Sequence, residues 1–366
     1  MTTARRGSSG HRLRLALDLL PPRTHDRLRT LGRTARRALG SGAPAAGSSP
    51  PSTLEPPRRA SASGRPGRVR RANILMYHRV ARDPGDPYSL CVAPERFAEQ
   101  LRVLTSRAEV VSLDDVRQPG RHPSVAVTFD DGYADNLLAA LPVAERFGVP
   151  ITVFVASQMV GSSTGFWWDR LAGALLRPVR MELSVRLPSG PVPLVTGTDP
   201  AARAALAQLR LRLLPLPVDL IDTVVAQVCT EVASEAETAG PRVLTHAELR
   251  SLAEHPLVTI GAHTTDHPLL RAQPPASQLE AVAASKADLE SLLGVEIRHF
   301  AYPFGHRASF DRRSIDVVRR AGFATACTTL RGSVTRRSDP LCLPRRMVMD
   351  WDADAFGGEL ESWGVR

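Results

Sequence analysis

The sequence predicts an α/β fold in which parallel strands alternate with helices and close into a barrel, and three observations support this. From Ala72 onward, seven or eight short apolar runs alternate with stretches whose apolar residues recur at helical spacing. The 366 residues are 43% hydrophobic, enough to bury one large core or two smaller ones. Polar residues follow several of the apolar runs directly, and a barrel carries its chemistry at these strand ends.

Residues 1–71 are predicted to form a basic, mostly disordered tail ahead of the folded part, residues 72–366. The tail holds sixteen arginines and three acids, which is +13, so the total of +10 leaves −3 for the folded part. Residues 11–39 could form short basic amphipathic helices, and residues 40–71 are rich in Gly, Pro, Ser and Ala. The charge therefore gives no support for a nucleic-acid partner, and we expect the tail to contact an anionic membrane or polymer.

The sequence contains no clear export signal or membrane span. No apolar run reaches the roughly 18 residues that a span requires. The leucine-rich segment 13–20 contains Arg14 and Asp18, and no cleavage pattern of small residues follows it. The location stays open, with a cytoplasmic or membrane-peripheral one favoured.

The strands and helices of the folded part follow from the apolar pattern. Strands are expected at 73–78, 109–113, 124–129, 151–156, 257–263, 298–303 and 323–328, with an eighth at 342–348. Helices are expected at 94–106, 134–147, 245–254, 276–293 and 309–321. Thr245 with Glu248 forms a predicted capping box, and Gly294 and Gly322 stand where helices end.

The barrel pattern breaks at about 161–241, where apolar-periodic stretches predict a helical insertion. Near its start, Trp167 and Trp168 are followed by Asp169. These residues could form a substrate-binding wall, because aromatic faces stack on the apolar faces of sugar rings. The alternative is that the two tryptophans anchor the insertion hydrophobically.

Asp130 and Asp131 come directly after the predicted strand 124–129. Two neighbouring carboxylates repel one another, and in a half-buried position one of them needs a cation or a strong donor. The pair therefore indicates a cation site, although Asp-Gly is also common in turns. Other strand ends should supply partners if the site is functional.

The strand 257–263 ends with such partners, His263 and His267. They are four residues apart, so one helical turn would bring both rings to the same side. Two imidazoles and one carboxylate form the ligand set that zinc hydrolases use, with positions left for water and substrate. Taken alone, the two histidines could also be satisfied core residues or exposed ones.

Three motifs in this order carry a resemblance to a known family. TFDDG (128–132), HTTDH (263–267) and FAYPFG (300–305) resemble the first three motifs of the polysaccharide deacetylases, the NodB-homology family of metal-dependent carbohydrate esterases. The resemblance spans roughly residues 74–348. It implies a distorted (β/α) barrel of seven or eight strands, in agreement with the strand count.

The resemblance also implies roles for individual residues. Asp130 would be the general base, and Asp131, His263 and His267 would bind one divalent ion, with zinc expected. In the FAYPFG loop, the backbone N–H of Tyr302 would stabilise the oxyanion, and Pro303 would contact the substrate.

Two departures from the family pattern put other roles in doubt. The family's third motif often has an arginine that holds the base, and Ala301 occupies that position here; Arg345 or Arg346 is the expected substitute. No late Leu-x-His motif supplies the general acid. Family members with a permuted strand order carry an early Tyr-His pair instead, so His78 is the expected acid and His306 the alternative.

The function implied is a hydrolase of carbon–nitrogen bonds other than peptide bonds, which removes N-acetyl groups from an amino-sugar polysaccharide or oligosaccharide. An O-acetyl esterase, a deformylase of a lipid-linked sugar or a cyclic amidase could use the same site. A non-catalytic carbohydrate-binding protein is the alternative of another class, with Ala301 as a sign of a decayed site. The intact Asp130, Asp131, His263 and His267 argue against that decay.

Overall fold

The structure of the chain is a computed structural model, and it describes residues 71–83, 85–118, 122–177, 179–232 and 241–366. Arg70–Arg366 forms one compact unit. The predictions made for the tail, residues 1–71, concern a segment that lies outside the described residues except for Arg71. Within the described part, no helix is both long and apolar enough to cross a membrane.

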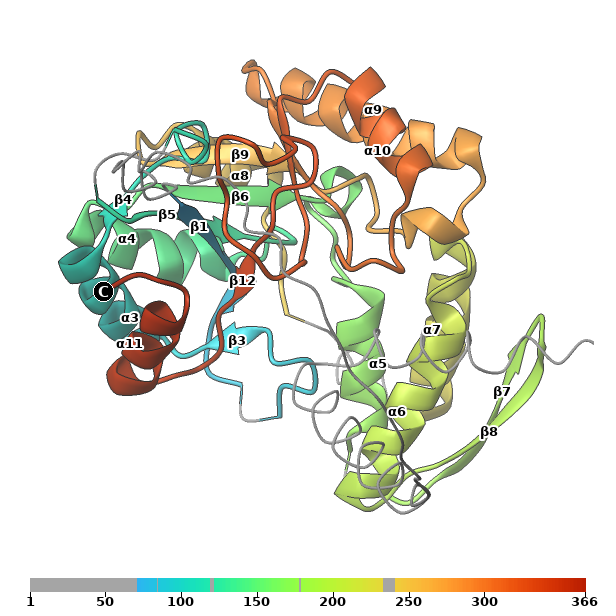
Figure 1. Cartoon of the computed structure of the whole chain (residues 1–366). Helices are drawn as coiled ribbons and strands as arrows, with labels where there is room; N and C mark the ends of the chain where they lie inside the picture. Colours follow the sequence, from blue (N-terminus) through green and yellow to red (C-terminus); the bar gives the residue numbers. More distant parts are fainter. Residues whose placement is uncertain (1–70, 84, 119–121, 178, 233–240) are drawn as a thin grey trace, which may run out of the picture. The chain divides into compact units, whose positions relative to one another are not determined.

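A curled sheet of parallel strands lies at the centre of this unit (Figure 1). The strand order is β11-β10-β9-β6-β5-β1-β12, and β4 also pairs with β5. The predicted α/β fold is confirmed, as a half-barrel of seven parallel strands, and all eight predicted strands are present. Their bounds are β1 (Ala72–Tyr77), β4 (Glu109–Val110), β5 (Ser124–Phe129), β6 (Ile151–Val155), β9 (Val258–Ala262), β10 (His299–Ala301), β11 (Thr325–Cys327) and β12 (Arg346–Met347).

The two edges of the half-barrel are connected by the chain segment that leads into β12. Leu343 donates its N–H to the Ala326 carbonyl and accepts a hydrogen bond from the Thr328 N–H, both at 2.8 Å, so it lies against β11. Three residues later, Arg346 pairs with Leu75 of β1. The segment around residues 343–347 therefore reaches from one edge strand to the other and brings Arg345 inside the curl.

The central strands are buried along their whole length. Every residue of β1, β5 and β6 is buried, which is typical of parallel strands covered on both faces. The polar side chains of β1 and β5 are hydrogen-bonded; Thr128, for example, donates to the Leu75 carbonyl at 2.8 Å. Beside β1 and β5, the rings of Tyr77, Phe97 and Phe129 pack with centroids 5.2–5.7 Å apart.

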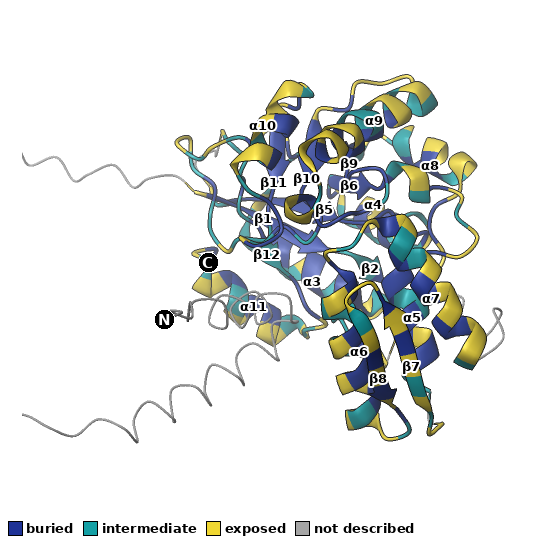
Figure 2. Cartoon of the chain, turned by 90° about the vertical axis from the view of Figure 1, so that its right-hand side faces the viewer, coloured by how far each residue is buried: buried dark blue, intermediate teal, exposed yellow. Residues whose placement is uncertain are grey.

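Helices cover the outside of the sheet. In Figure 1, α9 and α10 lie together on one side of the unit and α3 and α11 on another. Figure 2 shows buried residues on their inner faces and exposed residues on their outer faces. Their bounds are α3 (Pro94–Arg107), α4 (Leu141–Phe147), α8 (His246–Ala253), α9 (Pro275–Leu293), α10 (Arg312–Arg320) and α11 (Ala353–Ser362).

The predicted helix ends agree with the structure. Thr245 and Glu248 form the capping box of α8, and Gly294 ends α9 in the left-handed conformation. The predicted helix at 134–147 is divided into a π-helical turn, η1 (Asn136–Ala140), and α4. The sequence did not predict α11 or the short elements β2 (Arg79–Val80), β3 (Cys91–Val92), η2 (Ser157–Met159) and η4 (Leu270–Ala272).

The insertion contains a hairpin as well as helices, so the prediction of a purely helical insertion was incomplete. Its elements are α5 (Trp167–Leu175), β7 (Glu182–Leu187), β8 (Gly190–Val195), α6 (Asp199–Leu213) and α7 (Val218–Val232). The two strands pair antiparallel and alternate between more and less exposed residues. Gly190 at the turn has a φ of +110°, which favours glycine. Alternation on both sides of Pro-Ser-Gly was the signal for this hairpin in the sequence.

Substitution of Gly261 tests how tightly the centre of the sheet is packed. A Cβ on this residue of β9 would lie 2.5 Å from the Phe154 ring and 3.0 Å from the His299 carbonyl oxygen. We therefore expect Gly261→Ala to lower the free energy of unfolding by about 1–3 kcal/mol, measured by chemical denaturation.

Gly358 on α11 is the matched control, since its Cβ would meet no atom within 4 Å. Gly358→Ala should raise the free energy of unfolding by roughly 0.5–1 kcal/mol, because alanine favours helix more than glycine does. Equal effects in both variants would contradict the packing described for β9.

Candidate functional site

The carboxyl ends of three strands bring the predicted site residues together. Asp130 and Asp131 follow β5, His263 follows β9, and Tyr302 follows β10. The strands are parallel, so these ends meet on one side of the sheet. The structure brings Asp131, His263 and His267 together there, as the sequence predicted.

These three side chains form a buried group that could hold a metal ion. The Nε2 atoms of His263 and His267 each lie 3.5 Å from Asp131 Oδ1. Ligands of a tetrahedral ion with bonds of about 2.1 Å are roughly 3.4 Å apart, so this spacing fits a shared ion. Asp131 Oδ1 is also buried without a hydrogen-bond partner among the described residues, which leaves it available as a ligand.

The orientation of His263 is fixed in a way that suits a metal ligand. Its Nδ1 lies 2.7 Å from the Ala301 carbonyl oxygen. Because a carbonyl only accepts hydrogen bonds, Nδ1 carries the proton and Nε2 keeps its lone pair for an ion. Ala301 thus contributes its backbone to the site although it lacks the arginine side chain of the family motif.

The electrostatics of the group also fit a bound cation. Burial raises the pKa of Asp131 well above its usual range, and the nearby charges of Asp130 and Asp169 raise it further. Burial lowers the pKa of both His263 and His267. Without a cation, the group therefore favours a protonated acid and neutral imidazoles. A divalent ion would reverse the preference of Asp131 for its proton.

Asp130 faces Arg345 in a buried ion pair. Nη1 and Nη2 of Arg345 lie 2.6 and 2.7 Å from the two carboxylate oxygens, and Nε donates to the Thr328 carbonyl at 3.1 Å. Burial acts to raise the pKa of Asp130, but the charge and hydrogen bonds of Arg345, together with the nearby His263 and His78, outweigh burial and hold the pKa well below its usual range. Arg345 therefore replaces the missing arginine at position 301, and the alternative, Arg346, instead stacks on Trp363.

The loops of the site are held in an unusual backbone conformation. Asp131, Thr264, His267 and Phe304 have positive φ values of 76°, 68°, 62° and 59°. Among the described non-glycine residues, only Ser89 shares this feature. Non-glycine residues in this region cost of order 1 kcal/mol or more each, and such strain gathers at functional sites. His263 and His267 therefore converge through a left-handed turn, not through the helical turn that their spacing suggested.

Aromatic side chains pack around His267. Its ring centroid lies 4.6 Å from that of Phe304 and 4.8 Å from that of Trp168. Trp168 in turn stacks on Phe166 at 4.3 Å. Trp167 and Trp168 are only 3% and 5% exposed, so the prediction that they form a sugar-stacking wall is wrong. They anchor the insertion, and Trp168 covers the His267 ring.

A buried hydrogen-bonded chain connects α5 of the insertion to the Asp130–Asp131 loop. The Trp168 indole N–H donates to the Tyr133 hydroxyl at 3.2 Å, and that hydroxyl donates to Asp169 Oδ2 at 2.7 Å. Burial raises the pKa of Asp169 to about 7. Tyr133 was not among the predicted site residues; its signal in the sequence was a polar aromatic residue directly after Asp-Asp-Gly.

The structure does not support the expected roles of Tyr302 and Pro303. The Tyr302 N–H donates to the Cys327 carbonyl at 3.0 Å, and its hydroxyl donates to the Leu341 carbonyl at 3.0 Å. Its N–H is therefore engaged between β10 and β11 and cannot bind an oxyanion. Pro303 is buried, so it shapes the loop and offers no surface to a substrate.

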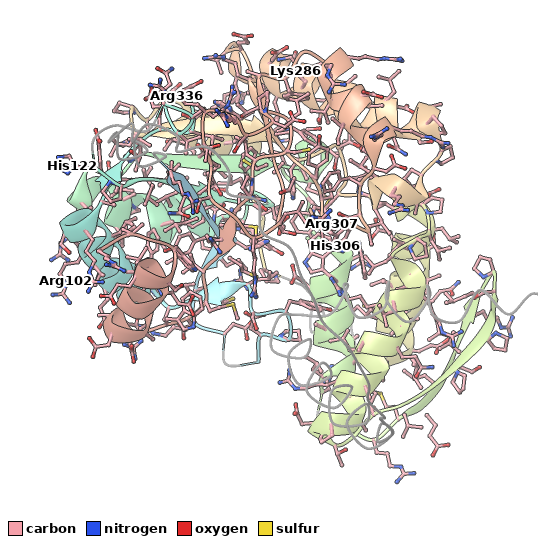
Figure 3. All side chains as sticks on the ribbon, viewed as in Figure 1. Arg102, His122, Lys286, His306, Arg307 and Arg336 are labelled. Carbon is pink, nitrogen blue, oxygen red and sulfur yellow. The ribbon has the colours of Figure 1, made fainter. Side chains whose placement is uncertain are left out.

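His78 directly follows β1, and the charges of Asp130, Arg345 and His263 act on its ring. Burial lowers its pKa to about 4, an effect that Asp130 opposes and Arg345 and His263 reinforce. The alternative, His306, lies next to Arg307 in the loop after β10 (Figure 3). Its Nδ1 accepts a hydrogen bond from the Ala308 N–H at 3.1 Å.

Comparisons with known proteins found a family model and a relative that are similar to this chain. The family model of polysaccharide deacetylase matches residues 117–186 and 224–326. A protein of Bacillus subtilis (strain 168) named "Putative polysaccharide deacetylase YxkH" is 21% identical over 298 residues, which cover 79% of this chain and 76% of that protein.

Solved structures share the fold. The Streptococcus pyogenes deacetylase PplD, in complex with acetate, matches with a TM-score of 0.52 and 18% identity over 81% of this chain and 99% of its own. IcaB from Ammonifex degensii matches with a TM-score of 0.52 and 18% identity over 81% of this chain and 98% of its own.

Substitution of Arg345 tests the ion pair with Asp130. Arg345→Gln leaves a buried carboxylate without its cation, so we expect the free energy of unfolding at pH 7 to fall by about 3–5 kcal/mol. Chemical denaturation in the presence of a chelator measures this loss. Arg346→Gln is the matched control, because Arg346 is half-buried and makes no ion pair among the described residues; it should change stability by less than about 1 kcal/mol.

The pH dependence follows from the direction of the pKa. In the unmodified protein the pKa of Asp130 is depressed, so its contribution is present above the unfolded pKa of about 3.9 and is lost only as the pH falls through the folded value. In Arg345→Gln, burial alone should raise that pKa, so the variant gains stability as the pH falls toward about 4. A stability difference that stays constant from pH 7 to pH 4 would contradict this assignment.

Proposed function

This chain belongs to the polysaccharide deacetylase family, and we propose that it hydrolyses N-acetyl groups of an amino-sugar polysaccharide or oligosaccharide. The products are acetate and a free amine. The observation that carries the proposal is the buried Asp131–His263–His267 group beside an Asp130 carboxylate held by Arg345. The three-residue group is suited to holding a metal ion, and the Asp130 carboxylate is suited to taking a proton from a water molecule.

Asp131, His263 and His267 would hold one divalent ion, and we propose zinc because two imidazoles and one carboxylate are the donor set of many zinc hydrolases. When bound, such an ion polarises a carbonyl group and makes a water molecule more acidic. The Ala301 carbonyl keeps His263 in the tautomer that this role requires.

Asp130 is proposed to take the proton of the attacking water. Its pairing with Arg345 makes it a weak base, so it depends on a water that has been made acidic. The same pairing fixes both carboxylate oxygens and keeps Asp130 ionised next to Asp131. Separate tasks for the two acids explain why neighbouring carboxylates occur at this strand end.

The oxyanion donor is proposed to be the N–H of Phe304, in place of that of Tyr302. Gly305 donates to the Pro303 carbonyl at 2.7 Å, so Phe304 lies at the centre of a three-residue turn with its φ at 59°. Among the described residues, the Phe304 N–H has no hydrogen-bond acceptor. Its ring packs on His267, which keeps this amide close to the ligand group.

His78 is proposed as the general acid. An amide releases its nitrogen only after protonation, since an amine anion is too basic to leave. A ring whose pKa is lowered to about 4 gives up a proton readily once it has received one.

An O-acetyl esterase, a deformylase or a cyclic amidase would use the same ligands, and acetate release from N-acetylated oligosaccharides distinguishes the leading function from these. A non-catalytic binding role is disfavoured because Asp131, His263 and His267 are all retained in a group suited to a metal ion.

Matched substitutions of the two acids test the division of their roles. Asp131→Asn should weaken zinc binding, because the buried ligand loses its charge. Asp130→Asn should keep about one zinc per chain but lose at least 100-fold in acetate release, since an amide cannot accept the proton. Metal analysis after dialysis and an acetate assay measure the two effects. Equal zinc loss in both variants would contradict the split, and stoichiometric zinc in the His263→Ala, His267→Ala double variant would contradict the site.

Substitution of His78 tests the general acid. His78→Ala should lower the rate on an N-acetyl substrate by about 100-fold or more, and noticeably less on an activated acetyl ester, whose leaving group needs no proton. Zinc content should not change. His306→Ala is the comparison variant and should affect neither rate by more than a few-fold. A loss in His78→Ala that is the same for both substrates would show that His78 is structural.

A further inference from the structure

A cavity lies at the opposite end of the sheet from the candidate active site. It has a volume of about 520 Å³ and is lined by Asp114, Arg117, Gln118, Arg298, Ala324, Thr325 and Arg336. Arg298 precedes β10 and Thr325 begins β11, so the cavity lies at the amino ends of these strands. Asp130, His263 and Tyr302 follow the carboxyl ends of strands in the same sheet, so the two regions share no residue.

The lining is strongly basic. Three arginines stand against one acid, which is a formal charge of +2. The acid, Asp114, is already engaged: its Oδ1 lies 2.9 Å from Arg298 Nη1 and 3.4 Å from Nε2 of the buried His299. Asp114 therefore pairs with residues of and next to β10, and it does not neutralise Arg117 and Arg336.

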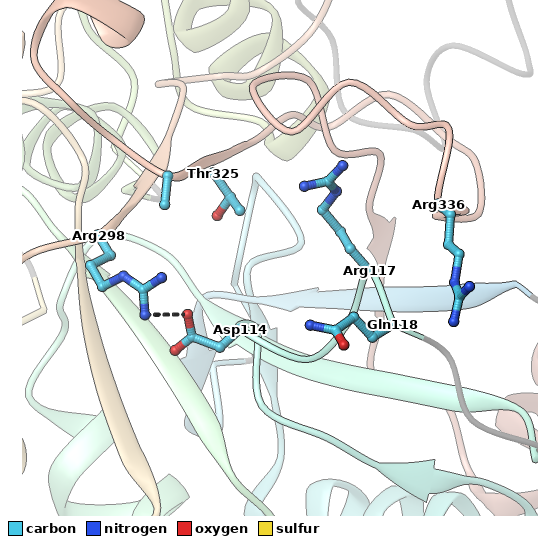
Figure 4. Close-up of a pocket in the computed structure, with 7 residues that line it drawn as sticks. Asp114, Arg117, Gln118, Arg298, Thr325 and Arg336 are labelled. Carbon is cyan, nitrogen blue, oxygen red and sulfur yellow. Dashed lines mark ion pairs between the residues drawn. The ribbon is translucent and has the colours of Figure 1, made fainter.

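Arg117 and Arg336 have no hydrogen-bond or ion-pair partner among the described residues. The Nε of Arg117 is also shielded from solvent, and a buried donor without an acceptor costs roughly 1–3 kcal/mol. Figure 4 shows Arg117 and Gln118 on one side of the cavity, with Arg298 and Arg336 flanking them and Thr325 above. An acceptor placed in this cavity would meet the Arg117 side chain, which lines it.

We propose that this cavity binds the phosphate monoester group of a sugar or of a polymer end. Such a group carries about −1.5 to −2 charges at pH 7, which matches the +2 of the lining. Its oxygens can accept paired N–H donors from a guanidinium group, a geometry that arginine is suited to. The Gln118 amide offers a further donor, and the volume lies within the range of small-molecule sites.

The inference does not depend on the proposed deacetylase activity. It rests on the charge, the volume and the shielded Arg117 donor at the amino ends of the strands. Its failure and the failure of the proposed function are therefore separable: Asp130→Asn should lose acetate release but bind the phosphate probe like the unmodified protein.

Isothermal titration of the full-length protein with glucose 6-phosphate, at low ionic strength, tests the proposal. We expect one site per chain and at least tenfold weaker binding of glucuronate, which carries a single carboxylate. In Arg117→Gln, Arg336→Gln the dissociation constant for glucose 6-phosphate should rise at least tenfold. Arg336→Lys, which keeps the charge but loses the paired donors, should show an intermediate rise.

The control variant removes the same charge elsewhere. Arg102 on α3 and Arg313 on α10 are exposed and have no side-chain partner among the described residues, and Figure 3 shows Arg102 far from Arg336. Arg102→Gln, Arg313→Gln should leave the dissociation constant unchanged within twofold. An equal loss in this control would reduce the effect to net charge and overturn the proposal.

Three further results would overturn the proposal. They are the absence of glucose 6-phosphate binding, binding that survives in the Arg117, Arg336 double variant, and binding only to phosphatidylglycerol vesicles. If Arg117→Gln is unstable, Arg336→Gln alone carries the test. Arg336 is exposed, so this variant should keep the thermal unfolding of the unmodified protein.

Discussion

The buried ion pair between Arg345 and Asp130 is the interaction on which both the fold and the site depend. Arg345 belongs to the segment that connects the two edges of the half-barrel, and Asp130 ends the central strand β5. The Nε donor of Arg345 holds Thr328 beyond β11, while its two Nη donors hold the carboxylate. The same side chain therefore bonds to the backbone beyond β11 and keeps the catalytic candidate ionised. A buried guanidinium costs several kcal/mol to desolvate, and only the carboxylate and carbonyl partners offset that cost.

The site also stores strain that the rest of the fold must compensate. Asp131, Thr264, His267 and Phe304 come from three different strand ends, yet all adopt positive φ. Each loop is held by nearby contacts: the Thr264 hydroxyl accepts the His267 N–H at 3.1 Å, and Trp168 and Phe304 pack on the His267 ring. The insertion thus contributes to the site through packing, because Trp168 belongs to α5. A ligand group arranged in this way keeps its geometry before any ion arrives, which lowers the conformational cost of binding one.

The sequence predicted the sheet, and the convergence of Asp131, His263 and His267 at its edge, because both depend on local patterns. Apolar runs of five or six residues mark buried parallel strands, and a polar residue directly after such a run must lie at the strand end. The same reasoning could not choose between Arg345 and Arg346. Neighbouring residues of an extended segment point to opposite faces, so one enters the curl and the other packs on Trp363, and only the pairing of Arg346 with Leu75 decides which.

The predictions that were wrong, for the backbone N–H of Tyr302 and for the two tryptophans, failed because contacts between distant segments decided them. A backbone N–H can bind an oxyanion only if no strand partner takes it, and Tyr302 is still within reach of the Cys327 carbonyl. The next residue with an N–H after Pro303 is Phe304, which has turned away from the sheet. Trp167 and Trp168 resembled a sugar platform because large aromatic residues serve both in cores and in binding sites. The surroundings of a tryptophan decide whether it belongs to a core or to a binding site. Here Phe166, Tyr133 and His267 pack around the tryptophans. Tyr133 and His267 lie far away in the sequence, and Phe166 becomes a neighbour only through the turn of α5. Motif spacing therefore locates a site along the chain, whereas the direction of each donor and ring is set by contacts between distant segments.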